Sequence, residues 1–154
     1  MIDRITHSGR VLTAREIREC EARLNVTLPT GYRQWMVAHN GGRPFPGVFT
    51  IHGLRHNPSD TIHSFVSIRA GTEDYDLESM AHRWRDFLPK GAVPIAVASC
   101  GRILVLMTSG QDQGQIYYCD MDEWDGDESR SALFLVAPTF EALLESLHEE
   151  AGTE

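Results

Sequence analysis

The sequence predicts a single α+β domain in which helices pack against one antiparallel sheet. The first observation is size: a chain of 154 residues with 42% hydrophobic residues is long enough to bury a core as one domain. The second is helical spacing of apolar side chains near the start, in the middle and at the end of the chain. The third is a set of short apolar runs between residues 93 and 120 that are separated by short turns, which is typical of antiparallel hairpins. We place the domain at residues 1–154, with its core at about residues 13–147.

The first helix is expected to begin after Thr13. Thr13 and Glu16 have the spacing of a capping box, in which each side chain satisfies an exposed backbone amide of the other residue. Asn25 is expected to end the helix in a left-handed turn. The apolar side chains that recur on one face of this helix are Ile17, Cys20 and Leu24.

A second helix is expected to follow directly. Pro29 holds Leu28 in an extended conformation, and Thr30 is positioned to cap the helix. Asn40-Gly41-Gly42 ends it, because Gly and Asn adopt positive φ at low cost. One face of this helix carries Tyr32, Trp35, Met36 and His39.

The middle of the chain predicts two strands and a third helix. Residues 48–51 and 62–68 have strand-like runs, and residues 55–60 between them are rich in turn-forming residues. Residues 73–87 have helical spacing, and Leu88-Pro89-Lys90-Gly91 ends that helix. The apolar side chains at helical spacing are Leu77, Met80, Ala81 and Trp84.

The last part of the chain predicts four strands and a final helix. The strands are residues 93–98, 103–107, 115–120 and 132–136. Because residues 103–107 are apolar throughout, we expect a central strand that is covered on both faces. Thr139 then caps a helix whose apolar side chains are Phe140, Leu143, Leu144 and Leu147.

Several of these segments together resemble the SUKH superfamily, which includes the fungal Smi/Knr cell-wall synthesis regulator. The resemblance extends over roughly residues 13–147, with Thr30-Gly31 at a place where members usually carry an acidic residue. The segments that carry it are Leu28-Pro29 through Tyr32 and Trp35 to Asn40-Gly41-Gly42, then Leu88-Pro89, Val93-Pro94-Ile95-Ala96, Gly114-Gln115-Ile116-Tyr117-Tyr118-Cys119-Asp120 and Thr139-Phe140-Glu141-Ala142-Leu143-Leu144.

The resemblance implies a SUKH-like α+β fold and a protein that acts by binding another protein. Bacterial members are mostly immunity proteins that bind and block a cognate domain of a polymorphic or contact-dependent toxin, often a nuclease or a deaminase. The family has no general catalytic residues to carry over. The alternative that it implies is a regulatory adaptor of the fungal type with no antitoxin role.

The charge of the chain is divided unevenly along its length. Residues 1–90 hold 12 basic and 10 acidic side chains, whereas residues 91–154 hold two basic and 12 acidic ones, so the net charge of -8 comes from the second part. Such a surface repels nucleic acids and anionic membranes and attracts basic proteins. We therefore expect a protein partner, and neither a nucleic acid nor a membrane.

The strongest local feature is the segment from Asp120 to Glu128, in which six of nine residues are acidic. It is either a solvated loop after a strand or a docking surface for a basic toxin domain, with an exposed tryptophan among carboxylates as its anchor. The residues predicted to bind the toxin are Asp120, Asp122, Glu123, Trp124, Asp125, Asp127 and Glu128.

Metal, cofactor and catalytic sites are not indicated by the sequence. In the acidic segment, Gly126 at the invariant glycine of a calcium-binding loop would place Met121 and Ala132 at ligand positions. His52, His56 and His63 have no cysteine nearby to complete a zinc site. A small hydrolase that uses Cys100 and a histidine is the third hypothesis, although no partner base stands at a definable spacing.

The expected compartment is the cytoplasm. The three cysteines form no close pair, so a disulfide framework is not indicated. No apolar run approaches the ~18 to 20 residues that a membrane span needs, and the first residues lack the layout of a secretory signal.

Overall fold

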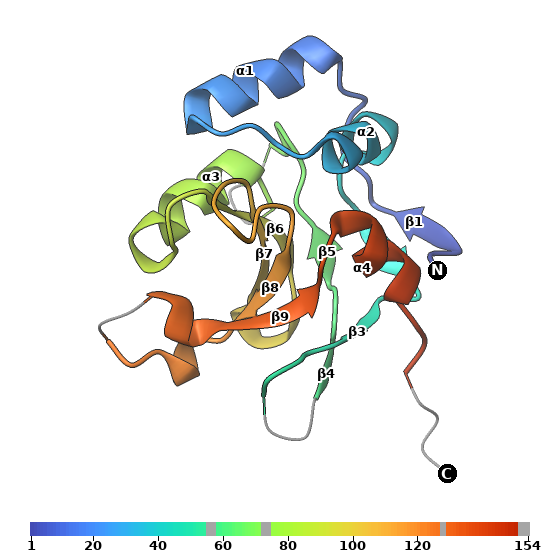
Figure 1. Cartoon of the computed structure of the whole chain (residues 1–154). Coiled ribbons are helices and arrows are strands. Elements are labelled where there is room, and N and C mark those ends of the chain that lie inside the picture. The colour runs from blue at the N-terminus through green and yellow to red at the C-terminus, as the bar shows by residue number, and fades with distance from the viewer. Residues whose placement is uncertain (55–57, 72–74, 127–128, 151–154) are drawn as a thin grey trace.

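The structure is a computed structural model that describes residues 1–54, 58–71, 75–126 and 129–150 (Figure 1). It confirms the predicted α+β class. The helices are α1 (Ala14–Leu24), α2 (Thr30–His39), α3 (Leu77–Trp84) and α4 (Phe140–Ser146). The strands are β1 (Arg4–Thr6), β2 (Arg43–Phe45), β3 (Val48–Thr50), β4 (Ser59–Thr61), β5 (Ser64–Phe65), β6 (Ala92–Val97), β7 (Ile103–Met107), β8 (Ile116–Cys119) and β9 (Leu133–Ala137).

The main sheet has five antiparallel strands in the order β5-β6-β7-β8-β9. β7 is its central strand, and all five of its residues are buried, as its uninterrupted apolar sequence predicts. In Figure 1, α3 and α4 lie to the left and right of these strands, with α1 and α2 above them. β7 therefore supplies the floor against which the rest of the domain packs.

Two additional antiparallel pairs, β1–β2 and β3–β4, lie outside the main sheet, so the expectation of a single sheet is wrong. β1 and β4 each have two exposed residues of three, and therefore show no apolar alternation that a sequence pattern would detect. β4 includes Ser59 and Asp60, which the sequence places in a turn. Of the predicted strand 62–68, only Ser64 and Phe65 form β5.

The start of α1 and the ends of α1 and α2 follow the predictions. Thr13 and Glu16 form the capping box, and Asn25 ends α1 with a φ of 55°. Asn40 ends α2 with a φ of 46°. The predicted cap at Thr30 is wrong: Pro29 occupies the N-cap position, and Thr30 is the first residue of α2. A proline already holds φ near the helical value, so the helix begins here without a side-chain cap.

α3 is shorter than the predicted helix 73–87. Asp76 caps it, because its Oδ2 accepts a hydrogen bond from the amide of Ser79 at 3.0 Å. After Trp84 the chain continues as a 3₁₀ turn, Arg85–Phe87. Because this turn is tighter than an α-helix, Phe87 does not continue the buried face of α3 and is exposed.

An aromatic core joins α2, β5 and α4. The Trp35 ring lies 4.7 Å from that of Phe65 and 5.4 Å from that of Phe140, and the Tyr32 ring lies 5.0 Å from that of Phe140. Tyr32 and Trp35 are buried, which confirms that they belong to the core. His39, predicted for the same face, is exposed, with its ring 5.2 Å from that of Trp35.

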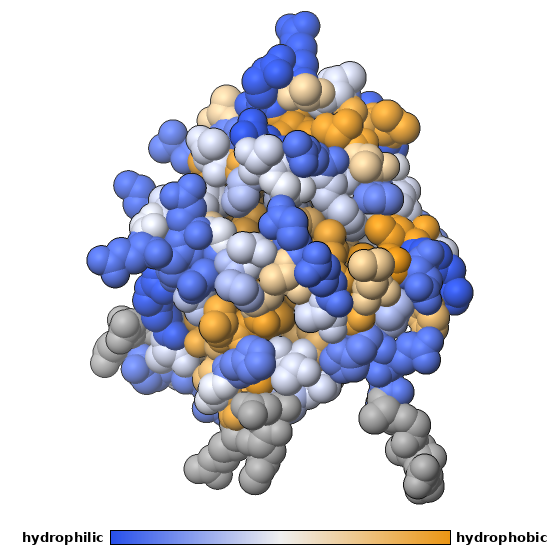
Figure 2. All heavy atoms as spheres, turned by 45° about the vertical axis from the view of Figure 1, so that its right-hand side comes forward, coloured by the Kyte–Doolittle hydropathy of each residue, from blue (hydrophilic) through white to orange (hydrophobic). Residues whose placement is uncertain are grey.

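Apolar side chains also reach the surface, but in separate places. On the face that Figure 2 turns towards the viewer, small apolar patches alternate with hydrophilic side chains. None of the helices in the described ranges has both the length and the hydrophobicity that crossing a bilayer requires.

Candidate partner-binding surface

The acidic segment begins where β8 ends and folds into a 3₁₀ turn, Met121–Glu123. Asp120 starts this turn, since its Oδ1 accepts a hydrogen bond from the amide of Asp122 at 3.1 Å. Arg102, which precedes β7, lies beside both: its Nε is 3.4 Å from Asp120 Oδ1, and its Nη2 is 3.0 Å from Asp122 Oδ2. One guanidinium thus holds the first two carboxylates of the segment together.

Three carboxylates of the segment face solvent. Asp122 is 81% exposed at its side chain despite its contact with Arg102, and Glu123 and Asp125 are also exposed. Asp127 and Glu128 lie outside the described residues. The described segment therefore carries four carboxylates, two of which pair with Arg102.

Trp124 differs from the expectation of an exposed anchor. Its indole is partly buried and packs against the core, and its Nε1 is enclosed without an acceptor in the described part of the chain. The ring meets Phe87 edge-to-face at 5.9 Å. Phe87 in turn lies 6.2 Å from Trp84, so three rings from two distant segments form one aromatic cluster (Trp84, Phe87 and Trp124).

Phe87 is the most open member of the aromatic cluster, with 39% of its surface exposed. Its position could not be predicted from the sequence, because only the 3₁₀ turn after α3 and the return of the chain at residue 124 bring the rings together. We call Phe87 together with Asp122, Glu123, Trp124 and Asp125 the acidic–aromatic surface.

Arg130, the other basic residue after residue 90, is also paired. Its Nη1 lies 2.7 Å from Asp112 Oδ2, and this hydrogen bond lowers the pKa of the Asp112 carboxyl. The hydroxyl of Tyr117 lies 3.1 Å from the same oxygen. Tyr118, on the opposite side of β8, is buried, and its hydroxyl donates to Asp60 at 2.9 Å. Both arginines of this part therefore form ion pairs within the protein, Arg102 with Asp120 and Asp122 and Arg130 with Asp112.

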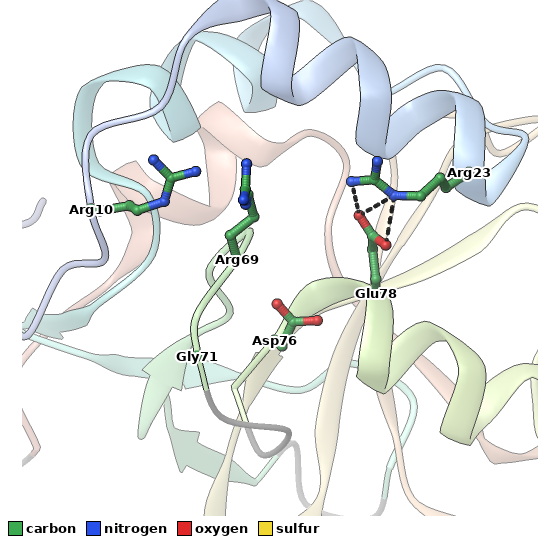
Figure 3. Close-up of a pocket in the computed structure, with 6 residues that line it drawn as sticks. All are labelled: Arg10, Arg23, Arg69, Gly71, Asp76 and Glu78. Atoms are coloured by element: carbon green, nitrogen blue, oxygen red, sulfur yellow. Dashed lines mark hydrogen bonds and ion pairs between the residues drawn. The ribbon is translucent and has the colours of Figure 1, made fainter.

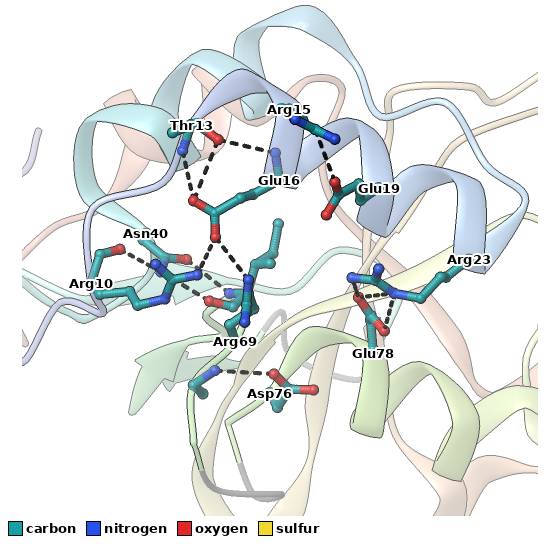
Figure 4. A network of polar contacts seen from close by, with 12 residues as sticks. Arg10, Thr13, Arg15, Glu16, Glu19, Arg23, Asn40, Arg69, Asp76 and Glu78 are labelled. Atoms are coloured by element: carbon teal, nitrogen blue, oxygen red, sulfur yellow. Dashed lines mark hydrogen bonds and ion pairs between the residues drawn. The ribbon is translucent and has the colours of Figure 1, made fainter.

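A charged cavity of about 470 Å³ lies between α1, residues 69–71 and the start of α3 (Figure 3). Its ionic groups are already paired within the protein. The guanidinium of Arg23 contacts both carboxylate oxygens of Glu78, at 2.6–3.0 Å. Glu16 binds Arg10 and also Arg69, the latter at 3.3 Å, as Figure 4 shows. These contacts tie the elements together, so the cavity is part of the scaffold.

Asn40 provides a second tie beside this network. Its side chain is buried; Nδ2 donates to the carbonyls of Arg10 at 2.8 Å and Ile68 at 3.1 Å, and Oδ1 accepts from the amide of Ile68 at 2.8 Å. Asn40 therefore ends α2 and also fixes two other segments against it.

The other residues considered from the sequence are dispersed. Across the described residues, no three side chains of His, Cys, Asp or Glu gather as metal ligands would. His63 contacts Arg43, whereas the backbone of His52 donates to Leu135 of β9, and His56 lies outside the described residues. Cys100 is exposed in the turn between β6 and β7, and no described histidine hydrogen-bonds to it.

A model of the SMI1 / KNR4 family (SUKH-1) matches residues 12–146. The match starts just before the cap of α1 and ends at the last residue of α4, so it includes the whole five-stranded sheet. No curated protein matches the chain.

Proposed function

Since the chain belongs to the SMI1 / KNR4 family (SUKH-1), and the SUKH superfamily includes immunity proteins, we propose that it is a non-catalytic immunity protein. It binds a cognate toxin domain in a one-to-one complex in the cytoplasm and blocks it there. The observation that carries this proposal is the acidic–aromatic surface, where exposed carboxylates flank Trp124 in the sequence and the Trp124 ring contacts the exposed ring of Phe87.

Charge supports a basic partner. Arg102 pairs with Asp120 and Asp122, and Arg130 pairs with Asp112, while the side chains of Asp122, Glu123 and Asp125 remain exposed to a partner. Complementary charge speeds the encounter of two proteins and fixes their orientation. Toxins that cleave nucleic acids carry basic surfaces that hold phosphates. A carboxylate-rich inhibitor competes for the same cations, which would block such a toxin directly.

The aromatic cluster supports a stable complex as well as a fast encounter. Phe87 is held between Trp84 and Trp124, so little conformational entropy is lost when a partner covers it. Aromatic side chains near the centre of an interface contribute a large share of binding energy. The exposed carboxylates thus speed the encounter with a basic partner, and the Phe87 ring contributes binding energy once the complex forms.

The test has two parts, partner capture and protection. The tagged protein is used to capture partners from its own cells at low and moderate salt, and the partners are identified by mass. We expect a basic partner with a toxin-like C-terminal domain, and co-expression should protect cells from that domain. Charge reversal with Asp122→Lys and Asp125→Lys should reduce the protection, whereas Glu145→Lys on α4 should not. Protection that is equal for all variants would remove the surface from the interface.

The family also supports the regulatory adaptor as a second candidate, because its name is that of the fungal regulator type. An adaptor of this kind would use the same surface on a cellular protein. It predicts capture of a housekeeping protein and no protection against any toxin domain. The same experiment therefore separates the two functions.

A further inference from the structure

A second groove, of about 760 Å³, includes Arg85 of the 3₁₀ turn in its lining. Its lining comes from the C-terminal half of α1 and the loop after it, from Arg33 of α2, from residues between 81 and 93 at the end of α3 and the start of β6, and from Thr108 and Ser109. In Figure 1 these parts of α1 and α3 lie one above the other at the left of the molecule. The groove uses none of the residues of the acidic–aromatic surface.

The lining of this groove is basic, in contrast to the protein as a whole. Of the 14 Lys and Arg residues in the chain, five line it, and only one acidic residue does. That acid, Glu21, is buried, and its Oε2 accepts a hydrogen bond from the amide of Leu28 at 2.7 Å. The lining thus has an excess of four positive charges in a protein of net charge -8. The five cations are Arg18, Arg23, Arg33, Arg85 and Lys90.

Most of these cations are not used by the protein itself. Arg23 is paired with Glu78, but the other four have no ion pair with any described residue. Arg18, Arg85 and Lys90 are exposed, and the Nε of Arg33 is enclosed without an acceptor in the described part of the chain. Like charges gathered around one groove repel each other, and an anionic ligand would relieve that repulsion.

The rest of the lining selects among anionic ligands. Apolar side chains alternate with the cations, among them Leu24, Val26, Leu88 and Val93. The lining that the structure describes includes no Phe, Tyr or Trp, and His82 provides its one imidazole ring, so bases of a nucleic acid would find little surface on which to stack. A better fit is a ligand whose carboxylates pair with the cations of the groove and whose aliphatic side chains contact the apolar residues between them. We propose that the groove binds an acidic polypeptide segment with interspersed aliphatic residues, supplied by a partner protein.

This proposal goes beyond the immunity function and does not depend on it, because the two surfaces share no residue. The probe is a fluorescently labelled peptide of Glu, Leu and Gly, measured by anisotropy against the full chain at low ionic strength. The groove variant is Arg18→Gln/Arg85→Gln/Lys90→Gln. The matched control is Arg4→Gln/Arg15→Gln/Arg43→Gln, which removes the same charge from exposed positions elsewhere. Circular dichroism verifies that both variants fold.

We expect the peptide to bind the wild-type chain, and to bind the groove variant at least about tenfold more weakly. The reason is that each exposed charge pair between peptide and groove contributes a few tenths to about one kcal/mol of binding energy. The control should stay within about twofold, by the same reasoning. A peptide with Gln in place of Glu should not bind. Absence of binding to the wild-type chain, or equal weakening in both variants, would overturn the proposal. Tighter binding of an oligothymidylate, displaced by the acidic peptide, would overturn it in favour of phosphate recognition. Each result is independent of toxin protection by the acidic–aromatic surface.

Discussion

Truncation of Phe87 tests the acidic–aromatic surface at the most exposed ring of the aromatic cluster. With 39% of the side chain exposed, about 80 Å² of a ring residue of roughly 200 Å² remains for a partner to cover. At about 25 cal/mol per Å² this area is worth about 2 kcal/mol, or roughly a 30-fold change in the dissociation constant. Phe87→Ala should therefore weaken toxin binding by this factor. Isothermal titration calorimetry with the captured toxin domain measures it.

The chain offers a matched control for this experiment. Phe45 in β2 is 40% exposed, and its ring contacts the guanidinium of Arg4 instead of the aromatic cluster. Phe45→Ala should leave binding unchanged. Trp124→Ala is a less direct probe, because its partly buried indole also supports the core and its loss would destabilise the fold. Equal affinities for Phe87→Ala and the wild-type chain would refute the assignment of Phe87 as an anchor.

Three further predictions concern the scaffold. Asn40→Ala should lower the free energy of unfolding, measured in urea titrations, by about 3–5 kcal/mol. The reason is that the substitution leaves buried backbone groups without hydrogen bonds and places an alanine at positive φ. A loss below about 1 kcal/mol would contradict the role given to this side chain. Ellman's reagent at pH 8 should label Cys100 alone in the native protein and all three thiols in denaturant, because burial raises the pKa of Cys20 to about 12 and that of Cys119 to about 11; fast labelling of more than one thiol in the native state would argue against this burial. The pKa values of these two thiols in the folded protein lie above the ordinary value of 9.0, so the contribution of the thiols to the free energy of unfolding is complete below pH 9 and is lost as the pH rises through 11 to 12. The urea midpoint of the wild-type chain should therefore fall over that range. It should fall less in a Cys20→Ala/Cys119→Ala variant.

Much of the fold could be predicted from the sequence because its determinants are local. The capping box at Thr13, the left-handed turns at Asn25 and Asn40, and the apolar run of β7 each act within a few residues. β1 and β4 could not be predicted in this way. Their residues are mostly exposed, so no apolar alternation marks them, and each is a strand because it pairs with another one, β1 with the distant β2 and β4 with the preceding β3.

Only part of the candidate site could be predicted from the sequence, because only part of it is formed by residues that are neighbours in the chain. The run of carboxylates from Asp120 onward is local, and so is the excess of acid in the last part of the chain. The direction in which Trp124 points depends on Phe87, which lies far away in the sequence. The basic groove is likewise assembled from three segments, each of which carries only one or two of its cations.

The dissociation constant of the toxin complex, measured as a function of salt concentration, tests whether a basic toxin domain docks on the acidic–aromatic surface. Opposite charges attract less at higher ionic strength, so the wild-type affinity should fall steadily as salt is added. Asp122→Lys/Asp125→Lys should bind at least about tenfold more weakly at low salt and show a flatter salt dependence, while Glu145→Lys should follow the wild-type chain. The same affinity and the same salt dependence in the wild type and the double variant would contradict the claim.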